Sequence, residues 1–253
     1  RQRQRCIRDR AMRYGNPSVT ETVAKLVNNG LEELFVMPLY PHYAMASYET
    51  VLVRVVEEIN RQASRVRLSI LQPFYADPAY IDALIESATP YLSGEFDLLL
   101  FSFHGIPEKH LRKTDPSHSH CLFTPDCCHT PHPAHATCYR HQCFETVRRF
   151  VERSGIPPQK YAVSFQSRLG RQPWLKPYTD LELERFARQG IQRILVMCPA
   201  FVTDCLETLE EIAMQGKELF ERAGGESITL IPCLNESSQW IRFLAAKVQD
   251  WSR

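Results

Sequence analysis

The sequence Leu-Leu-Leu-Phe-Ser-Phe-His-Gly-Ile-Pro, at residues 98–107, joins a buried strand to a chemically reactive side chain. Its first six residues are almost all apolar, which is typical of a parallel β-strand covered on both faces. His104 ends the apolar run, and Gly105 follows it. The strand predicted at residues 98–103 therefore stops where an imidazole could face a cleft.

Further short apolar runs alternate with longer amphipathic segments along the chain. The other predicted strands lie at residues 34–39, 68–72, 162–165, 194–198 and 229–232. Helical patterns cover residues 19–29, 48–62, 79–91, 144–154, 180–189, 204–223 and 237–251. This alternation predicts an α/β fold with parallel strands. Ligands of such sheets bind beyond the carboxyl ends of the strands, so we expect the site at residues 38–46, 102–107 and 199–207.

Composition limits the classes of function. The chain has 253 residues, 44% of them hydrophobic and 23% charged, which fits one large or two ordinary globular domains. A net charge of +1 does not favour binding to nucleic acid. The chain begins with Arg-Gln-Arg-Gln-Arg in place of Met, which we interpret as a fragment or a processed chain.

His104 is the first candidate site residue. A neutral imidazole can accept a proton near pH 7 or bind a divalent metal, and the glycine beside it leaves room for a ligand. The alternative is a structural histidine that caps the turn after the strand. The position in the sequence does not decide between the two.

Acidic residues after the fifth strand are the second candidate. Asp204, Glu207 and Glu211 are spaced i, i+3 and i+7, so a continuous helix would place them on one face. Such a line of carboxylates could pass a cation inward. The alternative is an N-cap at Asp204 with Glu207 as its N3 partner, and the motif alone favours that alternative.

The loop at residues 163–175 is the third candidate. It contains Gln166, Ser167, Arg168, Arg171 and Trp174. Guanidinium groups could pair with ligand carboxylates, and the indole could stack on a flat ring. The alternative is a solvated loop with a half-buried tryptophan.

Together these motifs resemble those of ferrochelatases. Three motifs occur in the same order in that family: Phe-His-Gly-Ile-Pro, Phe-Gln-Ser-Arg-Leu-Gly-Arg-Gln-Pro-Trp-Leu and Cys-Leu-Glu-Thr-Leu-Glu-Glu. Two stretches nearer the start are similar to the family's earlier motifs: Met12-Arg-Tyr-Gly-Asn-Pro and Pro38-Leu-Tyr-Pro-His-Tyr. The resemblance implies two Rossmann-like halves with parallel sheets, the chelatase fold, and an active site in the cleft between them. It also implies a lyase that inserts Fe²⁺ into protoporphyrin IX to form protohaem.

The resemblance implies a role for each matching residue. His104 and Glu207 would be catalytic, and with Glu211 and Asp204 they would contact the substrate iron. The residues that would bind the porphyrin are Arg13, Tyr14, Tyr40, Tyr43, Gln166, Ser167, Arg168 and Trp174. Which residue delivers the metal and which takes the proton stays open.

The resemblance also implies a domain organisation. Residues 1–93 would form an incomplete N-terminal half, and residues 94–235 the C-terminal half with a Cys/His-rich insertion at 107–143. Residues 236–253 would form a helix that packs back on the first half. One alternative is the same reaction on coproporphyrin. The family's opening strand and helices are absent before Met12, which leaves open a second alternative, a non-catalytic protein that binds a tetrapyrrole or an iron–sulfur cluster. The Gln-Ser-Arg and Pro-Trp loop argues against a chelatase for cobalt.

Five cysteines concentrate in one segment, spaced Cys121-x5-Cys127-Cys128-x9-Cys138-x4-Cys143. The segment resembles that of bacterial ferrochelatases with a 2Fe–2S cluster, which four of the five thiolates would hold. Cys121, Cys138 and Cys143 are the natural choices, with Cys127 or Cys128 as the fourth. Zinc is the main alternative, because six histidines lie nearby: His118, His120, His129, His132, His135 and His141. Unligated thiols are the third interpretation. A thiol cluster favours a reducing, cytoplasmic location, and peripheral membrane association and the oligomeric state stay open.

Overall fold

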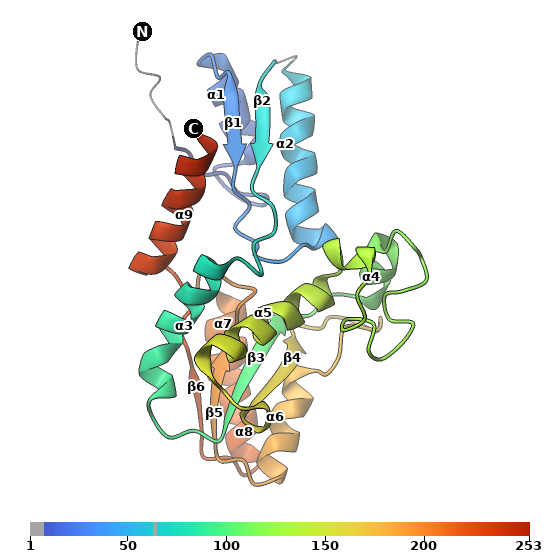
Figure 1. The fold of residues 1–253 in the computed structure, drawn as a ribbon, viewed down its shortest axis with the longest axis vertical. Helices are drawn as coiled ribbons and strands as arrows, with labels where there is room; N and C mark the ends of the chain where they lie inside the picture. The colour runs from blue at the N-terminus through green and yellow to red at the C-terminus, as the bar shows by residue number, and fades with distance from the viewer. Residues whose placement is uncertain (1–7, 63–64) are drawn as a thin grey trace. The chain divides into compact units, whose positions relative to one another are not determined.

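The computed structural model describes residues 8–62 and 65–253 (Figure 1). Residues 1–7, which include Cys6 and the Arg-Gln-Arg-Gln-Arg start, lie outside this range. The chain forms two compact units. The smaller unit comprises the chain up to Pro38 together with Met45–Gln72, and the larger comprises Leu39–Ala44 and Pro73–Arg253. The domain boundaries expected at residues 93 and 235 rest on the family resemblance and stay a prediction.

The smaller unit is a parallel strand pair with helices. Its elements are α1 (Val19–Asn28), β1 (Glu33–Val36), the π-helix η1 (Met45–Glu49), α2 (Thr50–Arg61) and β2 (Arg67–Ile70). Leu34 lies opposite Leu68 in the strand pair. The helices bury Val19, Val23, Val55 and Ile59 against these strands. Apolar residues at helical spacing therefore form this core, as the sequence pattern predicts.

The larger unit contains a four-stranded parallel sheet in the order β4-β3-β5-β6. The strands are β3 (Leu98–His104), β4 (Tyr161–Gln166), β5 (Arg193–Met197) and β6 (Ser227–Leu230). The first six residues of β3 are buried, and His104 at its end is half-buried. The parallel α/β class is confirmed.

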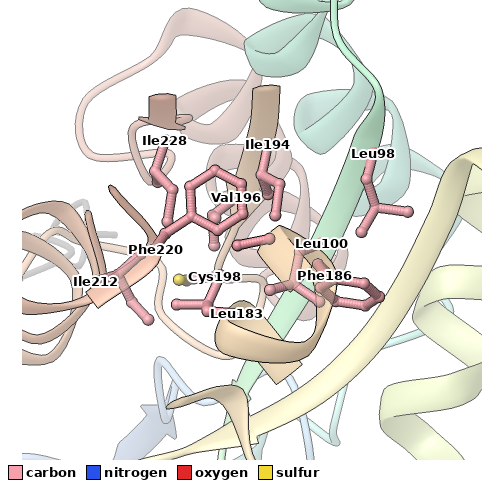
Figure 2. Packing of buried hydrophobic residues seen from close by; sticks show 11 residues of the cluster. Leu98, Leu100, Leu183, Phe186, Ile194, Val196, Cys198, Ile212, Phe220 and Ile228 are labelled. Carbon is pink, nitrogen blue, oxygen red and sulfur yellow. The ribbon is translucent and has the colours of Figure 1, made fainter. Parts of the chain in front are cut away.

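Alternate residues of β3 serve opposite faces of this sheet. Leu98 and Leu100 join the core cluster that α6 (Thr179–Arg188) and α8 (Lys217–Arg222) complete (Figure 2). On the other face, the Phe101 ring lies 5.2 Å from the ring of Phe150 in α5 (Tyr139–Ser154). The sheet is thus covered on both sides, which explains the unbroken apolar run that ends at His104.

The C-terminal helix α9 (Ser238–Trp251) packs on α3 (Pro78–Leu92) within the larger unit. Their contact is aromatic: the ring centroids of Trp240 and Phe243 lie 5.8 and 5.2 Å from that of Phe74, four residues before the start of α3. Lys247 Nζ also bonds Asp77 Oδ2 at 2.5 Å. These contacts fix α9 to a helix that falls within residues 1–93 of the sequence.

The prediction of one continuous helix at residues 204–223 is wrong. The segment divides into α7 (Leu206–Leu209), the π-helix η4 (Glu211–Gly216) and α8. The amide of Gln215 donates to Glu210 O at 2.9 Å, which is the wider π-helical hydrogen bond. A Cβ added at Gly216 would lie only 3.2 Å from Leu183 Cδ1, so the turn packs tightly against α6. Tertiary packing here overrides the regular α-helical repeat.

Two other element boundaries differ from the sequence pattern. The helix expected from residue 48 begins as η1 at Met45, and the helix expected from residue 144 begins at Tyr139. The stretch at 107–142, in which no helix was predicted, contains α4 (Glu108–Thr114) and the 3₁₀ turn η2 (Pro133–Ala136). A second 3₁₀ turn, η3 (Pro158–Lys160), precedes β4. Cysteines and histidines interrupt the apolar periodicity here and hide these helical turns.

Candidate active site

The end of β3 fixes the position and the tautomer of His104. The Gly105 amide donates to Gln166 O at 2.7 Å. A Cβ added at Gly105 would approach that oxygen to 2.8 Å, so only glycine fits without a shift. His104 Nδ1 lies 2.5 Å from Gly105 O. A carbonyl oxygen only accepts, so we assign the proton to Nδ1 and the free lone pair to Nε2.

Aromatic rings flank the imidazole. The ring centroids of Trp174 and Phe201 lie 6.4 and 6.1 Å from that of His104. From the opposite side of the strand, the Tyr139 hydroxyl donates to His104 O at 2.9 Å. The histidine is therefore held by its backbone and its Nδ1, and its half-buried ring lies near two half-buried aromatic side chains.

Glu207 lies in the first turn of α7 and carries a negative charge at neutral pH. The Cys205 thiol and the Glu207 amide donate hydrogen bonds to its carboxylate, and the nearby His104 adds to their effect, so its pKa is lowered although partial burial opposes this. The Gln166 side chain also donates to Glu207 O at 2.6 Å. The structure thus brings Glu207 and His104, 103 positions apart in the sequence, close enough for the charge of His104 to lower the pKa of Glu207.

Glu211 is bound by the loop that follows β4. Its carboxylate accepts hydrogen bonds from Ser167 N at 2.6 Å, Ser167 Oγ at 2.5 Å and Gln166 Nε2 at 3.2 Å. Three donors to one carboxylate connect η4 to this loop. Gln166 and Ser167, which the resemblance implies for porphyrin binding, use these polar groups to hold the acidic segment.

Asp204 connects the start of the acidic segment to the chain after β6. Its carboxylate accepts from Asn235 Nδ2 at 2.7 Å and from Cys233 N and Thr208 Oγ1 at 3.2 Å each. Burial alone would raise its pKa, but hydrogen bonds from Asn235, Cys233 and Thr208 outweigh that effect and lower it. The alternative in which Asp204 caps a helix is wrong, because Cys205 is the N-cap of α7.

Because η4 is a π-helix, Asp204, Glu207 and Glu211 do not share one α-helical face. Each carboxylate instead has its own set of donors. Glu207 keeps the electrostatic contact with His104, while Asp204 and Glu211 hold the segment on its two sides. The wider helical turn therefore separates the three acidic residues by role.

The remaining residues of the loop after β4 form their own contacts. Arg168 Nη2 pairs with Asp180 Oδ2 at 2.6 Å, and its guanidinium lies 4.3 Å from the centre of the Tyr178 ring. Trp174 Nε1 donates to Leu169 O at 2.9 Å, which fixes the indole beside His104. The guanidinium of Arg168 is thus already paired with a carboxylate of this chain.

The predicted porphyrin contacts near the N-terminus belong to different units. Tyr40 and Tyr43 are half-buried in the loop Leu39–Ala44 of the larger unit. Arg13 and Tyr14 belong to the smaller unit, where Arg13 Nε donates to Thr50 O at 3.2 Å and its guanidinium lies 4.7 Å from the centre of the Tyr14 ring. Each set is ordered by contacts within its own unit.

The chain is similar to known proteins along nearly its whole length. The family model described as Ferrochelatase matches residues 2–251. The chain belongs to the ferrochelatase family. A relative from Opitutus terrae, named Ferrochelatase, is 56% identical over 95% of this chain and 70% of its own length. Another of the same name, from Ectopseudomonas mendocina, is 50% identical over 92% of this chain and 69% of its own length.

A solved structure supports the same fold. The chain resembles SirB from Bacillus subtilis with Fe³⁺ at a TM-score of 0.59 and 14% identity, over 93% of this chain and 78% of that one. This likeness confirms the chelatase fold. Family membership confirms the reaction expected from the sequence: the insertion of Fe²⁺ into protoporphyrin IX to form protohaem, the last step of haem biosynthesis.

In this ferrochelatase, Asp115 organises the start of the cysteine-rich segment. Its carboxylate accepts from Ser117 N at 2.9 Å and Oγ at 2.7 Å, and from the amides of His120 and Cys121 at 2.9 and 2.8 Å. Burial alone would raise the pKa of Asp115, but hydrogen bonds from Ser117, Cys121 and His120 hold it well below its usual value. One buried carboxylate thus places Cys121 at the base of the segment.

Three thiols of the segment meet. Those of Cys121 and Cys128 donate to the sulfur of Cys138, which lowers the pKa of Cys138. Arg140 Nη1 lies 3.8 and 3.6 Å from the sulfurs of Cys127 and Cys128, so Cys127 is close to the group. Cys143 is fully buried near Cys138, and its thiol forms a hydrogen bond with Tyr139.

Histidines surround the same segment. The rings of His120 and His132 stack at 3.9 Å, and those of His135 and His141 stack at 3.6 Å. His120 Nε2 and His135 Nε2 both lie within 2.9 Å of Cys127 O. These two nitrogens therefore donate to a carbonyl, which leaves them without a lone pair for a metal in this arrangement.

Across residues 8–62 and 65–253, no group of three or more His, Cys, Asp or Glu side chains has metal-binding geometry. The donor chemistry of the segment nevertheless fits a soft metal, because the buried thiols of Cys121, Cys127 and Cys128 gather near the sulfur of Cys138, whose pKa is lowered. The described part of the chain also contains no helix long and apolar enough to span a membrane.

Sequence reasoning missed four residues of the site. Phe201 and Tyr139 contact His104, Cys205 contacts Glu207, and Gln142 contacts the loop with Tyr43. The position of Cys205, two residues before Glu207, was the one available signal. Tyr139 and Gln142 lay in a stretch that the sequence assigned to irregular structure.

Proposed function

We propose that His104 is the base of metal insertion in this chain and that Glu207 is its anionic partner. Protoporphyrin IX must lose two pyrrole N–H protons when Fe²⁺ replaces them, and these protons leave as the iron–nitrogen bonds form. The observation that carries the proposal is the Nδ1 contact with Gly105 O, because it leaves the Nε2 lone pair as the acceptor.

Glu207 would stabilise the imidazolium that forms when His104 accepts a proton. Its lowered pKa keeps the carboxylate ionised at neutral pH. A carboxylate in electrostatic contact with the base would also attract the incoming Fe²⁺, which prefers nitrogen and oxygen donors of this kind. We assign proton removal to His104, which would accept the two protons one after the other at Nε2 and release each to solvent water. We assign the guidance of iron to Glu207, with Glu211 and Asp204 positioning the segment that carries Glu207.

The porphyrin would lie against the aromatic surroundings of His104. Trp174 offers a flat apolar ring, and its hydrogen bond to Leu169 O fixes that ring in place. Tyr40 and Tyr43 would contribute from the loop Leu39–Ala44, and the family resemblance adds Arg13 and Tyr14 to the proposed porphyrin contacts. Arg168 would exchange its pairing with Asp180 for a porphyrin propionate, while Gln166 and Ser167 would act by positioning Glu207 and Glu211.

We further propose that the cysteine-rich segment holds a 2Fe–2S cluster through Cys121, Cys127, Cys128 and Cys138. The convergence of Cys121 and Cys128 on Cys138 supports this set. Cys143 is the alternative fourth ligand, and its contact with Tyr139 argues against it. When bound, the cluster would cross-link the segment. It would take no part in metal insertion.

Zinc remains the alternative for this site, and the hydrogen bonds from His120 and His135 to Cys127 O argue for thiolates alone. Eight free cysteines among the described residues support a cytoplasmic location, where thiols stay reduced. Peripheral membrane association stays a proposal from the family resemblance.

The decisive experiment is His104→Ala with anaerobic Fe²⁺ and either protoporphyrin IX or coproporphyrin. We expect turnover to fall by about 10²–10⁴-fold, the range of general base catalysis, with porphyrin affinity retained. His110→Ala is the matched control, because this half-buried histidine of α4 belongs to neither proposed site. Turnover of His104→Ala at the level of that control would contradict the assignment, and the ratio of the two porphyrin rates identifies the preferred substrate.

A further inference from the structure

Gln142 is a fully buried amide in the second turn of α5. Its Oε1 accepts a hydrogen bond from the Tyr43 amide at 2.7 Å. Its Nε2 donates to Ala136 O at 3.0 Å and to His135 O at 3.4 Å. One side chain thus joins the loop Leu39–Ala44 to the turn that precedes Cys138.

The two segments that this amide joins both carry proposed sites. Tyr43 lies in the loop that we propose to contact porphyrin. His135 and Ala136 belong to η2, which lies between Cys128 and Cys138 in the sequence. Because a buried polar group is costly to leave unpaired, a change at one end of Gln142 should be transmitted to the other.

The neighbouring residues of α5 provide a comparison. Thr146, one turn further along, contacts His42 Nε2 at 2.9 Å and donates to Tyr75 O at 2.9 Å. It therefore supports the same loop, and its remaining side-chain contact, with Gln142 O at 3.1 Å, stays within α5 and does not reach η2 or the rest of the cysteine-rich segment before α5. Gln142 differs from Thr146 in joining the loop to that segment.

We infer that Gln142 is a positioning residue that couples the state of the cysteine-rich segment to porphyrin binding by holding the loop with Tyr43. The inference rests on the proposed porphyrin role of that loop. When the segment is ordered, Ala136 O and His135 O hold the Gln142 amide, and its Oε1 stays directed at the Tyr43 amide. When the segment loosens, the amide turns and the loop loses its support.

The test uses two variants. Gln142→Met is similar in size but forms none of the three hydrogen bonds of the amide, with Tyr43, Ala136 and His135. Cys121→Ser disturbs the cysteine-rich segment at its other end. We expect Gln142→Met to speed hydrogen exchange of the Tyr43 amide and to weaken protoporphyrin affinity, measured by fluorescence, by about tenfold. Cys121→Ser alone should weaken that affinity by a smaller factor, and adding it to Gln142→Met should produce no further change.

Thr146→Val is the matched control, because it should loosen the same loop. In the double variant Thr146→Val with Cys121→Ser, the two reductions in protoporphyrin affinity should multiply, as expected for independent effects. If Gln142→Met fails to fold, Gln142→Glu replaces it, since Glu retains the acceptor for Tyr43 and loses the amide donors. That variant should keep the Tyr43 amide protected and should abolish its response to Cys121→Ser.

Unchanged exchange at Tyr43 in Gln142→Met, or an effect of Cys121→Ser that persists in full in Gln142→Met, would overturn the coupling. Failure of the unmodified chain to bind protoporphyrin would instead contradict the proposed porphyrin site. In that case hydrogen exchange alone decides whether Gln142 links the two segments, so the two failures are distinguishable.

Discussion

Replacing Gly105 by alanine tests how tightly the chain fixes its proposed base. The added Cβ would lie 2.8 Å from Gln166 O and 3.3 Å from Trp174 Cε3. The first distance is more than half an ångström short of an ordinary contact, and the neighbour is backbone, in a strand that pairs with β3. The two strands must therefore separate at the residue that holds His104.

The expected effects follow from this crowding. Overpacking of this kind costs about 1–3 kcal/mol in the free energy of unfolding. The imidazole should also move, because His104 Nδ1 bonds Gly105 O, and a misplacement of about 1 Å can reduce turnover by about 10²-fold. Urea denaturation measures the first effect, and anaerobic metallation of protoporphyrin measures the second.

Gly94→Ala is the control. Its new Cβ would meet only Tyr91 O, at an ordinary 3.5 Å, so its stability and turnover should change little. If Gly105→Ala matched this control in both measurements, the reasoning that backbone crowding positions His104 would be refuted. Loss of turnover without loss of stability would place the effect on the imidazole alone.

Three further predictions concern the carboxylates and the thiols. Glu207→Gln should abolish metal insertion and lower the free energy of unfolding by no more than about 0.5–2 kcal/mol. The control Glu210→Gln should keep activity. Retained turnover in Glu207→Gln would limit Glu207 to a structural role. Folding lowers the pKa of Asp115, so the ionised carboxylate stabilises the fold above about pH 4, and this stabilisation is lost as the pH falls further. Acid titrations followed by circular dichroism should show this loss in the unmodified chain and not in Asp115→Asn. Anaerobically prepared protein should absorb in the visible range and contain about two irons and two sulfides per chain. Cys138→Ser should remove this absorption, and Cys143→Ser should not. A content of one zinc without sulfide would exclude the cluster.

Much of the fold was predictable from sequence because it depends on local patterns. Each of the six strands in the described part of the chain overlaps a predicted apolar run, although β6 shares only residues 229 and 230 with its prediction. Strands buried on both faces need nearly continuous apolar sequence, which makes them visible. The same logic placed His104 at a strand end and the acidic residues after the neighbouring strand. Gly105 was visible beside His104, although its steric role was not.

The tertiary structure alone decided how these residues are used. The π-helix η4 depends on close packing at Gly216 and on the three donors that hold Glu211, so the carboxylates do not form the straight line that their spacing suggests. The Tyr43 amide and Gln142 meet across 99 positions of sequence. Periodicity reports contacts within about one helical turn or one strand repeat, and it therefore carries no signal for a pairing set by the packing of α5 on the sheet.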